Sequence, residues 1–223
     1  MLKCYKKTLS DFDFISLRER THLSMLSSLT GRKIYHTLDP TLLVEKRSLE
    51  TIMNKNFPLP YYEYVLIFNL DCSMLPLAEK VTKILKLPAI IYNKPPLITY
   101  RSKIIYRKFR KWPSFSSLGP REFLALLANA EFIITNSFHG TALSIIFSKP
   151  FMTIISGSYL RVGSRILDLL ELLKLKDRVF TPENPKRTLS EIIRKPIDYD
   201  CVMELLNNAR RDSLKLLYMC VSE

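Results

Sequence analysis

Two short apolar runs, joined by a polar turn and a helix within residues 131–153, constrain the fold of this chain more than any other stretch. Phe132 to Thr135 is β-branched and lacks polar alternation, which is typical of a parallel strand covered on both faces. Thr141 to Phe147 is apolar on nearly every side and predicts a helix sunk into a core. Phe151 to Ile155 begins a second strand. The order strand, helix, strand predicts an α/β fold with a Rossmann-like parallel sheet and flanking helices.

The turn between the first strand and this helix carries His139 and Gly140. Ligands of open α/β sheets bind beyond the carboxyl ends of the strands. A helix N-terminus at that edge offers free amides and a positive dipole end to a phosphate or carboxylate. Ser137 or Thr141 is placed to cap the helix. We therefore expect Ser137, Gly140 and Thr141 to bind substrate and His139 to transfer a proton near neutral pH; the alternative is a core histidine bonded to backbone.

The whole chain is expected to form four parts. They are a remnant of an N-terminal Rossmann-like domain, a polar connector, a C-terminal Rossmann-like domain that carries the site, and a docking helix, at residues 1–45, 46–60, 61–199 and 200–223. The expected elements outside the opening stretch are strands at 12–18, 33–37, 64–68 and 89–92, helices at 19–29, 75–85, 166–175 and 200–218, a helix opening at 120, and turns or loops at 38–41 and 156–165. A single β-α-β unit cannot close its own core, so the first part must pack on the others or on another chain.

The chain carries a net charge of +13, which suits nucleic acid, an anionic membrane face or anionic substrates. Basic and aromatic residues alternate over 93–118, a pattern that fits nucleic-acid, sugar or membrane contact as well as a solvated crossover. Neither glycine-rich nucleotide fingerprint occurs, and the four scattered cysteines have no metal-ligand spacing. We therefore expect reduced cysteines, a cytoplasmic protein, no metal and no cofactor.

Several segments together resemble the polysaccharide pyruvyl transferase family. The most specific is Ile-Thr-Asn-Ser-Phe-His-Gly-Thr-Ala-Leu-Ser-Ile-Ile-Phe-Ser-Lys-Pro-Phe, preceded by Gly-Pro-Arg-Glu-Phe-Leu. Supporting segments are Phe-Ile-Ser-Leu-Arg-Glu, Leu-Asp-Pro-Thr-Leu-Leu and Ser-Arg-Ile-Leu-Asp-Leu-Leu with Lys-Asp-Arg, at 14–19, 38–43 and 164–178.

The resemblance implies a fold like that of GT-B glycosyltransferases, with the site between two Rossmann-like domains. It implies transfer of a pyruvyl group from phosphoenolpyruvate to a sugar or lipid-linked oligosaccharide as a ketal, in cell-surface polysaccharide biosynthesis such as that of capsule or exopolysaccharide. Positions that match the family are Arg18 and His139, with Arg161 or Arg165 supplying basic contacts. Arg18 has an alternative role, an ion pair with Glu19 or Glu50.

A full family member has a complete N-terminal Rossmann-like domain, of which only the last unit is expected here. We expect the isolated chain to be inactive or poorly soluble unless another chain supplies that half. Two alternatives remain open: a GT-B glycosyltransferase that uses a sugar nucleotide, and a non-catalytic basic binding fragment. Nucleic acid is the less favoured partner, and a peripheral position at the inner face of the membrane is compatible with the expected acceptor.

Overall fold

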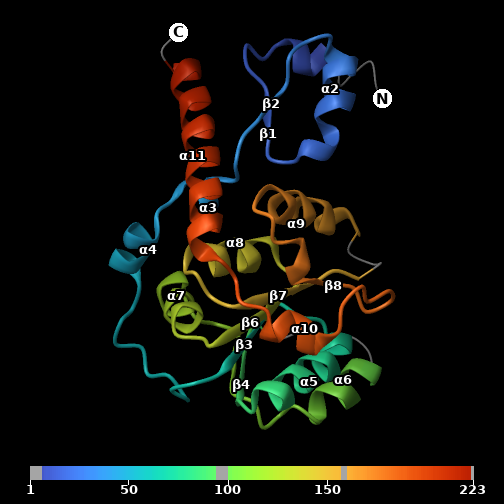
Figure 1. The fold of residues 1–223 in the computed structure, drawn as a ribbon, viewed down its shortest axis with the longest axis vertical. Coiled ribbons are helices and arrows are strands. Elements are labelled where there is room, and N and C mark those ends of the chain that lie inside the picture. Colours follow the sequence, from blue (N-terminus) through green and yellow to red (C-terminus); the bar gives the residue numbers. More distant parts are fainter. Residues whose placement is uncertain (1–6, 94–99, 157–159, 222–223) are drawn as a thin grey trace.

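The computed structural model describes residues 7–93, 100–156 and 160–221, without the side chains of residues 100, 101 and 160–163. Its centre is a six-stranded sheet in the order β5-β4-β3-β6-β7-β8, in which every neighbouring pair is parallel (Figure 1). The strands are β3 (Val65–Phe68), β4 (Ala89–Tyr92), β5 (Ser114–Phe115), β6 (Phe132–Thr135), β7 (Phe151–Ile154) and β8 (Val179–Phe180). This order is that of a Rossmann fold, and it confirms the predicted α/β class. The chain leaves β3 in one direction and returns beside it as β6, so the switch point lies between these two strands.

Helices cover both faces of this sheet (Figure 1). One face packs on α5 (Leu75–Leu85), α6 (Tyr100–Arg107) and α10 (Leu189–Arg194). The other packs on α7 (Pro120–Ala128), α8 (Phe138–Ile146), α9 (Leu160–Leu172) and α11 (Tyr199–Val221). Successive strand residues point to opposite faces of the sheet. Leu66 and Ile133 pack on the side of α7, α8, α9 and α11, whereas Ile67 packs on the side of α5, α6 and α10. Two further 3₁₀ turns are η2 (Cys72–Met74) and η4 (Lys176–Arg178).

The N-terminal part, residues 7–44, is a separate small unit beside α9 and α11 (Figure 1). It contains β1 (Ser16–Leu17), η1 (Arg20–His22), α2 (Leu23–Thr30), β2 (Tyr35–His36) and α3 (Pro40–Leu43), and α4 (Lys46–Ile52) follows. β1 and β2 form a two-stranded parallel sheet, as the β-α-β prediction requires. Gly31 is the C-cap of α2, with φ of 69° in the left-handed region that glycine adopts freely.

Three local predictions were wrong. The expected turn at 38–41 is the start of α3, because the Asp39 side chain accepts from the Thr41 amide and caps the helix. The loop expected at 156–165 is helical from Leu160 onward. His139 and Gly140 lie inside the first turn of α8 rather than in a turn before it.

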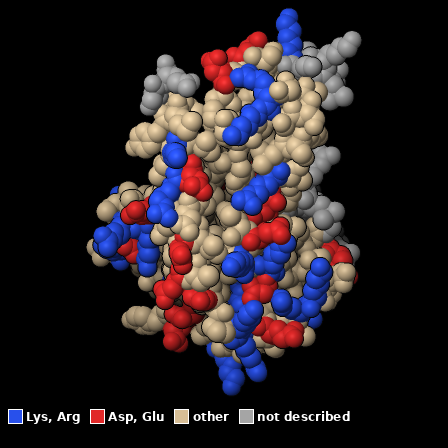
Figure 2. Space-filling view, turned by 45° about the horizontal axis from the view of Figure 1, so that its top comes forward, with Lys and Arg blue, Asp and Glu red and all other residues tan. Residues whose placement is uncertain are grey.

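Three aromatic residues of the basic stretch form part of the core. Tyr106, Phe109 and Trp112 are each at least 92% buried against α5 and the sheet, and the Phe109 and Trp112 rings lie 4.8 Å apart. They therefore offer no ring faces for bases to stack on. Lys94 lies outside the described residues. On the face shown in Figure 2, Lys and Arg are interspersed with Asp and Glu rather than gathered in one patch.

Among the described residues, no helix is both long and apolar enough to cross a membrane.

Candidate functional site

The N-terminus of α8 lies at the carboxyl end of β6, at the switch point of the sheet. Ser137 is its N-cap: the Ser137 hydroxyl accepts from the Gly140 amide at 3.4 Å, and the Ser137 amide donates to Thr135 Oγ1 at 3.0 Å. A helix leaves its first amides without intrahelical acceptors. Within the described residues, the amides of Phe138 and His139 are thus available to an anion, where the helix dipole also favours negative charge.

Gly140 and Thr141 hold this helix end against the sheet. A Cβ on Gly140 would lie 2.4 Å from Thr135 Oγ1 and 2.6 Å from Phe68 Cδ1, so only glycine fits. The Thr141 side chain is fully buried and its hydroxyl bonds to Thr153 Oγ1 at 2.8 Å. Both residues were predicted to bind substrate, but their contacts are with the protein interior, so they position the helix end rather than face a ligand.

The His139 side chain, in contrast, is exposed. Its ring meets the Phe138 ring edge to face, with 5.6 Å between centroids. The guanidinium of Arg165 lies over the same Phe138 ring, 5.4 Å from its centroid. Phe138 thus links the predicted proton donor to a predicted anion-binding arginine. Sequence reasoning missed this role because a phenylalanine in a mostly apolar helix is no signal of a site.

Arg18 follows β1, and its Nη1 donates to Asp39 Oδ2 at 2.5 Å. Half of the Arg18 side chain is exposed, whereas the Asp39 side chain is 3% exposed. Burial raises the pKa of the Asp39 carboxyl, but hydrogen bonds from Thr41 and Arg18 outweigh that effect and hold it below its usual range. The alternative pairing of Arg18 with Glu19 or Glu50 is wrong, and the second Nη group and Nε of Arg18 make no further contact among the described residues.

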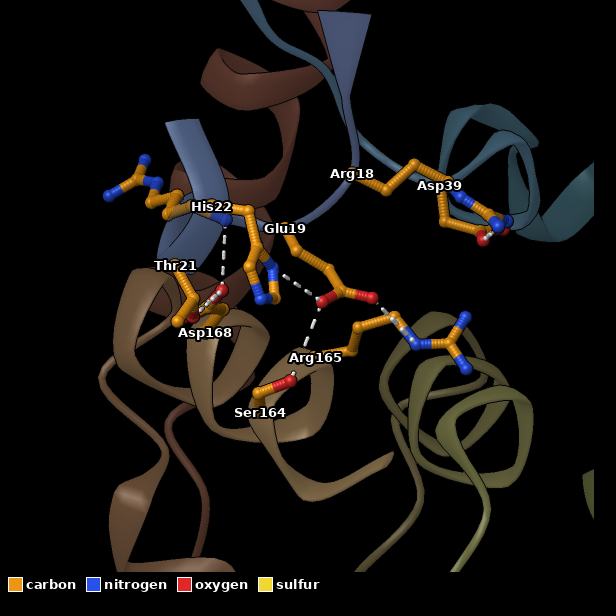
Figure 3. Close-up of polar contacts among 9 residues, drawn as sticks. Arg18, Glu19, Thr21, His22, Asp39, Ser164, Arg165 and Asp168 are labelled. Atoms are coloured by element: carbon orange, nitrogen blue, oxygen red, sulfur yellow. Dashed lines mark hydrogen bonds and ion pairs between the residues drawn. The ribbon is translucent and has the colours of Figure 1, made fainter. Parts of the chain in front are cut away.

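Arg165 projects from α9, and its Nε lies 3.3 Å from Glu19 Oε1. Figure 3 shows its two Nη groups directed away from Glu19, toward α8. The other Glu19 oxygen contacts Ser164 Oγ at 3.5 Å and His22 Nδ1 at 3.4 Å. Arg161 is in the first turn of α9, and its side chain lies outside the described residues.

Asp168, one turn further along α9, holds the N-terminal unit on the same helix (Figure 3). Its Oδ2 accepts from the Arg20 amide at 2.9 Å and from Thr21 Oγ1 at 3.2 Å. His36 lies nearby, and burial, followed by the positive charge of Arg20, lowers its pKa although the Asp168 charge opposes this.

A narrow cleft of about 10 Å³, room for about one water molecule, lies along this seam between the N-terminal unit and α9. Arg18, Asp39, Phe138 and Arg165 line it, whereas His139 is not among its lining residues. The structure therefore brings two predicted arginines to one cleft and places the predicted proton donor beside it, across Phe138. Sequence reasoning missed Asp39 and Asp168, and it considered Glu19 only as a partner of Arg18, whereas Glu19 pairs with Arg165. Asp39 alone carried a signal, since Asp-Pro-Thr is a helix N-cap sequence.

No three His, Cys, Asp or Glu side chains among residues 7–93, 100–156 and 160–221 cluster in a way that could hold a metal ion.

Comparison with known proteins gives a family match and a likeness to solved structures. The family model for polysaccharide pyruvyl transferase matches residues 1–158, which include His139 and Arg18 but not Arg161 or Arg165. No curated protein sequence matches the chain. Among solved structures, E. coli ADP-heptose lps heptosyltransferase II aligns with 81% of this chain and 55% of its own, at 10% identity and a TM-score of 0.39. The chain thus spans about half the length of that protein.

Proposed function

The chain belongs to the polysaccharide pyruvyl transferase family, and we propose that it transfers a pyruvyl group from phosphoenolpyruvate to sugar hydroxyls. One observation carries this proposal: the exposed His139 stands on the first turn of a helix whose leading amides are free, at the switch point of a parallel sheet. An anion held by those amides lies within reach of an acid/base group on the same turn.

The reaction needs a proton delivered to the methylene carbon of phosphoenolpyruvate, which makes the adjacent carbon oxocarbenium-like. A sugar hydroxyl adds there and loses its own proton. A second hydroxyl then forms a bond to the same carbon as the bond from that carbon to the phosphate oxygen breaks; the leaving phosphate takes that hydroxyl's proton, and the pyruvate carbon is left in a ketal. We assign the first proton transfer to His139 and the return of the hydroxyl proton to the same side chain.

The two charged groups of phosphoenolpyruvate require cations and amides. The amides of Phe138 and His139 offer one anion position. The unused guanidinium groups of Arg165 and Arg18 offer another, since each arginine keeps donors beyond its acidic partner. Glu19 and Asp39 fix the orientation of these guanidinium groups. Arg161 stays a further candidate.

A sugar or lipid-linked oligosaccharide is the proposed acceptor, in cell-surface polysaccharide biosynthesis. A lipid-linked acceptor would place the protein in the cytoplasm at the inner face of the membrane. We also propose that a second Rossmann-like domain, from the same or another chain, closes the site above α8.

Replacing His139 tests the chemistry. With His139→Gln, phosphate release from phosphoenolpyruvate in the presence of an acceptor should fall about 10²- to 10⁴-fold in kcat, the usual contribution of general acid–base catalysis. Binding of phosphoenolpyruvate, measured by calorimetry, should change little. His22→Gln is the matched control, because among the described residues the only ion pair or side-chain hydrogen bond of His22 is with Glu19.

Two outcomes would contradict the proposal. One is full turnover by His139→Gln. The other is that a sugar nucleotide binds the chain and phosphoenolpyruvate does not, which would favour the glycosyltransferase alternative.

A further inference from the structure

Three asparagines follow three adjacent strands of the sheet at the switch point. Asn69 follows β3, Asn93 follows β4 and Asn136 follows β6, so all three stand at the carboxyl edge where α8 begins. Their side chains form a chain of hydrogen bonds: Asn93 Nδ2 donates to Asn69 Oδ1 at 2.8 Å, and Asn69 Nδ2 donates to Asn136 Oδ1 at 3.4 Å.

This series of asparagine hydrogen bonds leaves one polar group without a partner at each end. The Nδ2 group of Asn136 and the Oδ1 atom of Asn93 have no partner among the described residues. Asn136 is 94% buried as a residue, but no buried side-chain nitrogen or oxygen of the described residues lacks a partner, so its spare Nδ2 group still reaches solvent. Asn69 and Asn93 are exposed, and solvent-sized groups can reach them. A ligand at this edge therefore meets a donor at one end of the cluster and an acceptor at the other.

Aromatic packing holds the strand ends that carry the cluster. Phe68 and Tyr92 immediately precede two of the asparagines, and both rings pack on Phe123 at centroid distances of 4.7 Å and 4.4 Å. The backbone of Asn69 and Asn93 is left-handed, with φ of 57° and 63°. Asparagine tolerates that conformation, and glycine adopts it at no cost.

The cluster differs in chemistry from the arginine-lined cleft. Its amides are uncharged and pair a donor with an acceptor, which is the pattern that neighbouring sugar hydroxyls require, whereas a phosphate or carboxylate offers acceptors only. We propose that Asn69, Asn93 and Asn136 form the subsite for the acceptor, a pyranose with vicinal hydroxyls. This inference rests on the proposed function, because it assigns the acceptor side of that reaction. It puts the hydroxyls beside His139, three residues after Asn136 on the same strand-to-helix connection.

The test separates the side chains from the backbone turn. In a double variant, Asn69→Gly and Asn93→Gly keep the left-handed backbone and remove both side chains. Lys86→Gly is the matched control, because Lys86 has the same φ of 57° but precedes β4, at the opposite edge of the sheet. The probes are methyl glycosides of galactose, glucose and mannose and their 2-acetamido forms. Saturation-transfer NMR measures the binding of each glycoside to the full chain.

We expect an NMR saturation-transfer signal, which reports binding, for at least one glycoside. The affinity for that glycoside should fall about tenfold or more in the double variant, as for two lost hydrogen bonds. It should not fall in Lys86→Gly. Phosphoenolpyruvate affinity should be the same in all three proteins. The acceptor subsite is overturned, and donor binding is left intact, if no glycoside gives a saturation-transfer signal or if the double variant gives the same signal as the unaltered chain. Failure of the unaltered chain to bind phosphoenolpyruvate overturns the proposed function instead, whatever the glycosides do.

Discussion

The two sheets of this protein are stabilised in different ways. The six-stranded sheet is covered on both faces, and its strands β3, β4, β6 and β7 consist almost wholly of buried residues. In the two-stranded unit, no described residue from 7 to 36 is buried. Polar contacts join residues 7–36 to the large sheet's helices: Glu19 with Arg165, and Asp168 with Thr21. Just past β2 the chain enters the core, where Leu38 and Leu42 are buried and the Leu38 amide donates to Ser213 Oγ at 3.0 Å.

The difference teaches where each kind of residue acts. In the large sheet, apolar burial supplies the driving force, and a polar group is costly unless it is fully bonded. In the small unit, polar contacts are shared with water, so each contributes little alone. The candidate site uses both: α8 is fixed by the core, and the cleft is formed where the loosely held unit meets α9.

A pair of arginines gives the largest expected contrast. Arg178 is 99% buried, and its Nη1 donates to the carbonyls of Ile192 and Lys195, each at 2.9 Å, while Nη2 pairs with Asp177. Arg178→Met leaves the two carbonyls without their donor, while Asp177 keeps its pair with Lys195, and should lower the free energy of unfolding by about 1–3 kcal/mol for each buried acceptor. The fluorescence of Trp112, the single tryptophan and a core residue of this sheet, follows the urea transition.

The counterpart is Arg32, which also donates to backbone carbonyls, those of Ser10, Phe12 and Asp13, but at a partly exposed position. Arg32→Met should change the Trp112 transition by less than about 1 kcal/mol, since water replaces the lost donors. Equal shifts in the two variants would mean that both regions unfold as one unit, and the contrast would fail.

A pair of glycines gives an intermediate effect. Gly140→Ala forces a methyl group to within 2.4 Å of Thr135 Oγ1, and overpacking of this kind costs about 1–3 kcal/mol. Gly31→Ala has open space around the new methyl group but keeps φ at 69°, so its cost is the strain alone, about 1 kcal/mol. Thermal unfolding by circular dichroism measures both, and a larger loss for Gly31→Ala would reverse the expected order.

The same contrast explains what the sequence revealed. Strands β3, β4, β6 and β7 and helix α5 match their predicted ranges to within a residue, because continuous apolar runs and a helical stripe are local signals. Strands β5 and β8 have two residues each and exist only by pairing with longer neighbours, which no local pattern shows.

At the candidate site, the sequence alone could single out His139 and Ser137, because strand end, cap and helix are contiguous in the chain. The ion pair of Arg18 with Asp39 joins residues 21 positions apart, and that of Arg165 with Glu19 joins residues 146 positions apart. The asparagine cluster joins three strand ends that become neighbours only in the folded sheet. Such pairings depend on tertiary placement, so sequence spacing could not predict them.

The smallest expected effect is a pH dependence confined to the small unit. Burial and the charge of Arg20 depress the pKa of His36 below its ordinary value of about 6.5. With its pKa depressed, His36 binds fewer protons in the folded unit than in the opened unit. The free energy of opening is therefore highest above pH 6.5, and it decreases as the pH falls through the folded-state pKa. Asp39 contributes nothing in this range, because its lowered pKa keeps the carboxylate ionised.

Hydrogen exchange of amides 7–36, corrected for intrinsic rates, should therefore show weaker protection at pH 5.5 than at pH 7.5, while strands β3 and β6 keep theirs. His36→Gln cannot titrate, so its protection of the small unit should be the same at both values. If the Gln variant lost protection on acidification as the unaltered chain does, the titration of His36 would not control the attachment of the small unit.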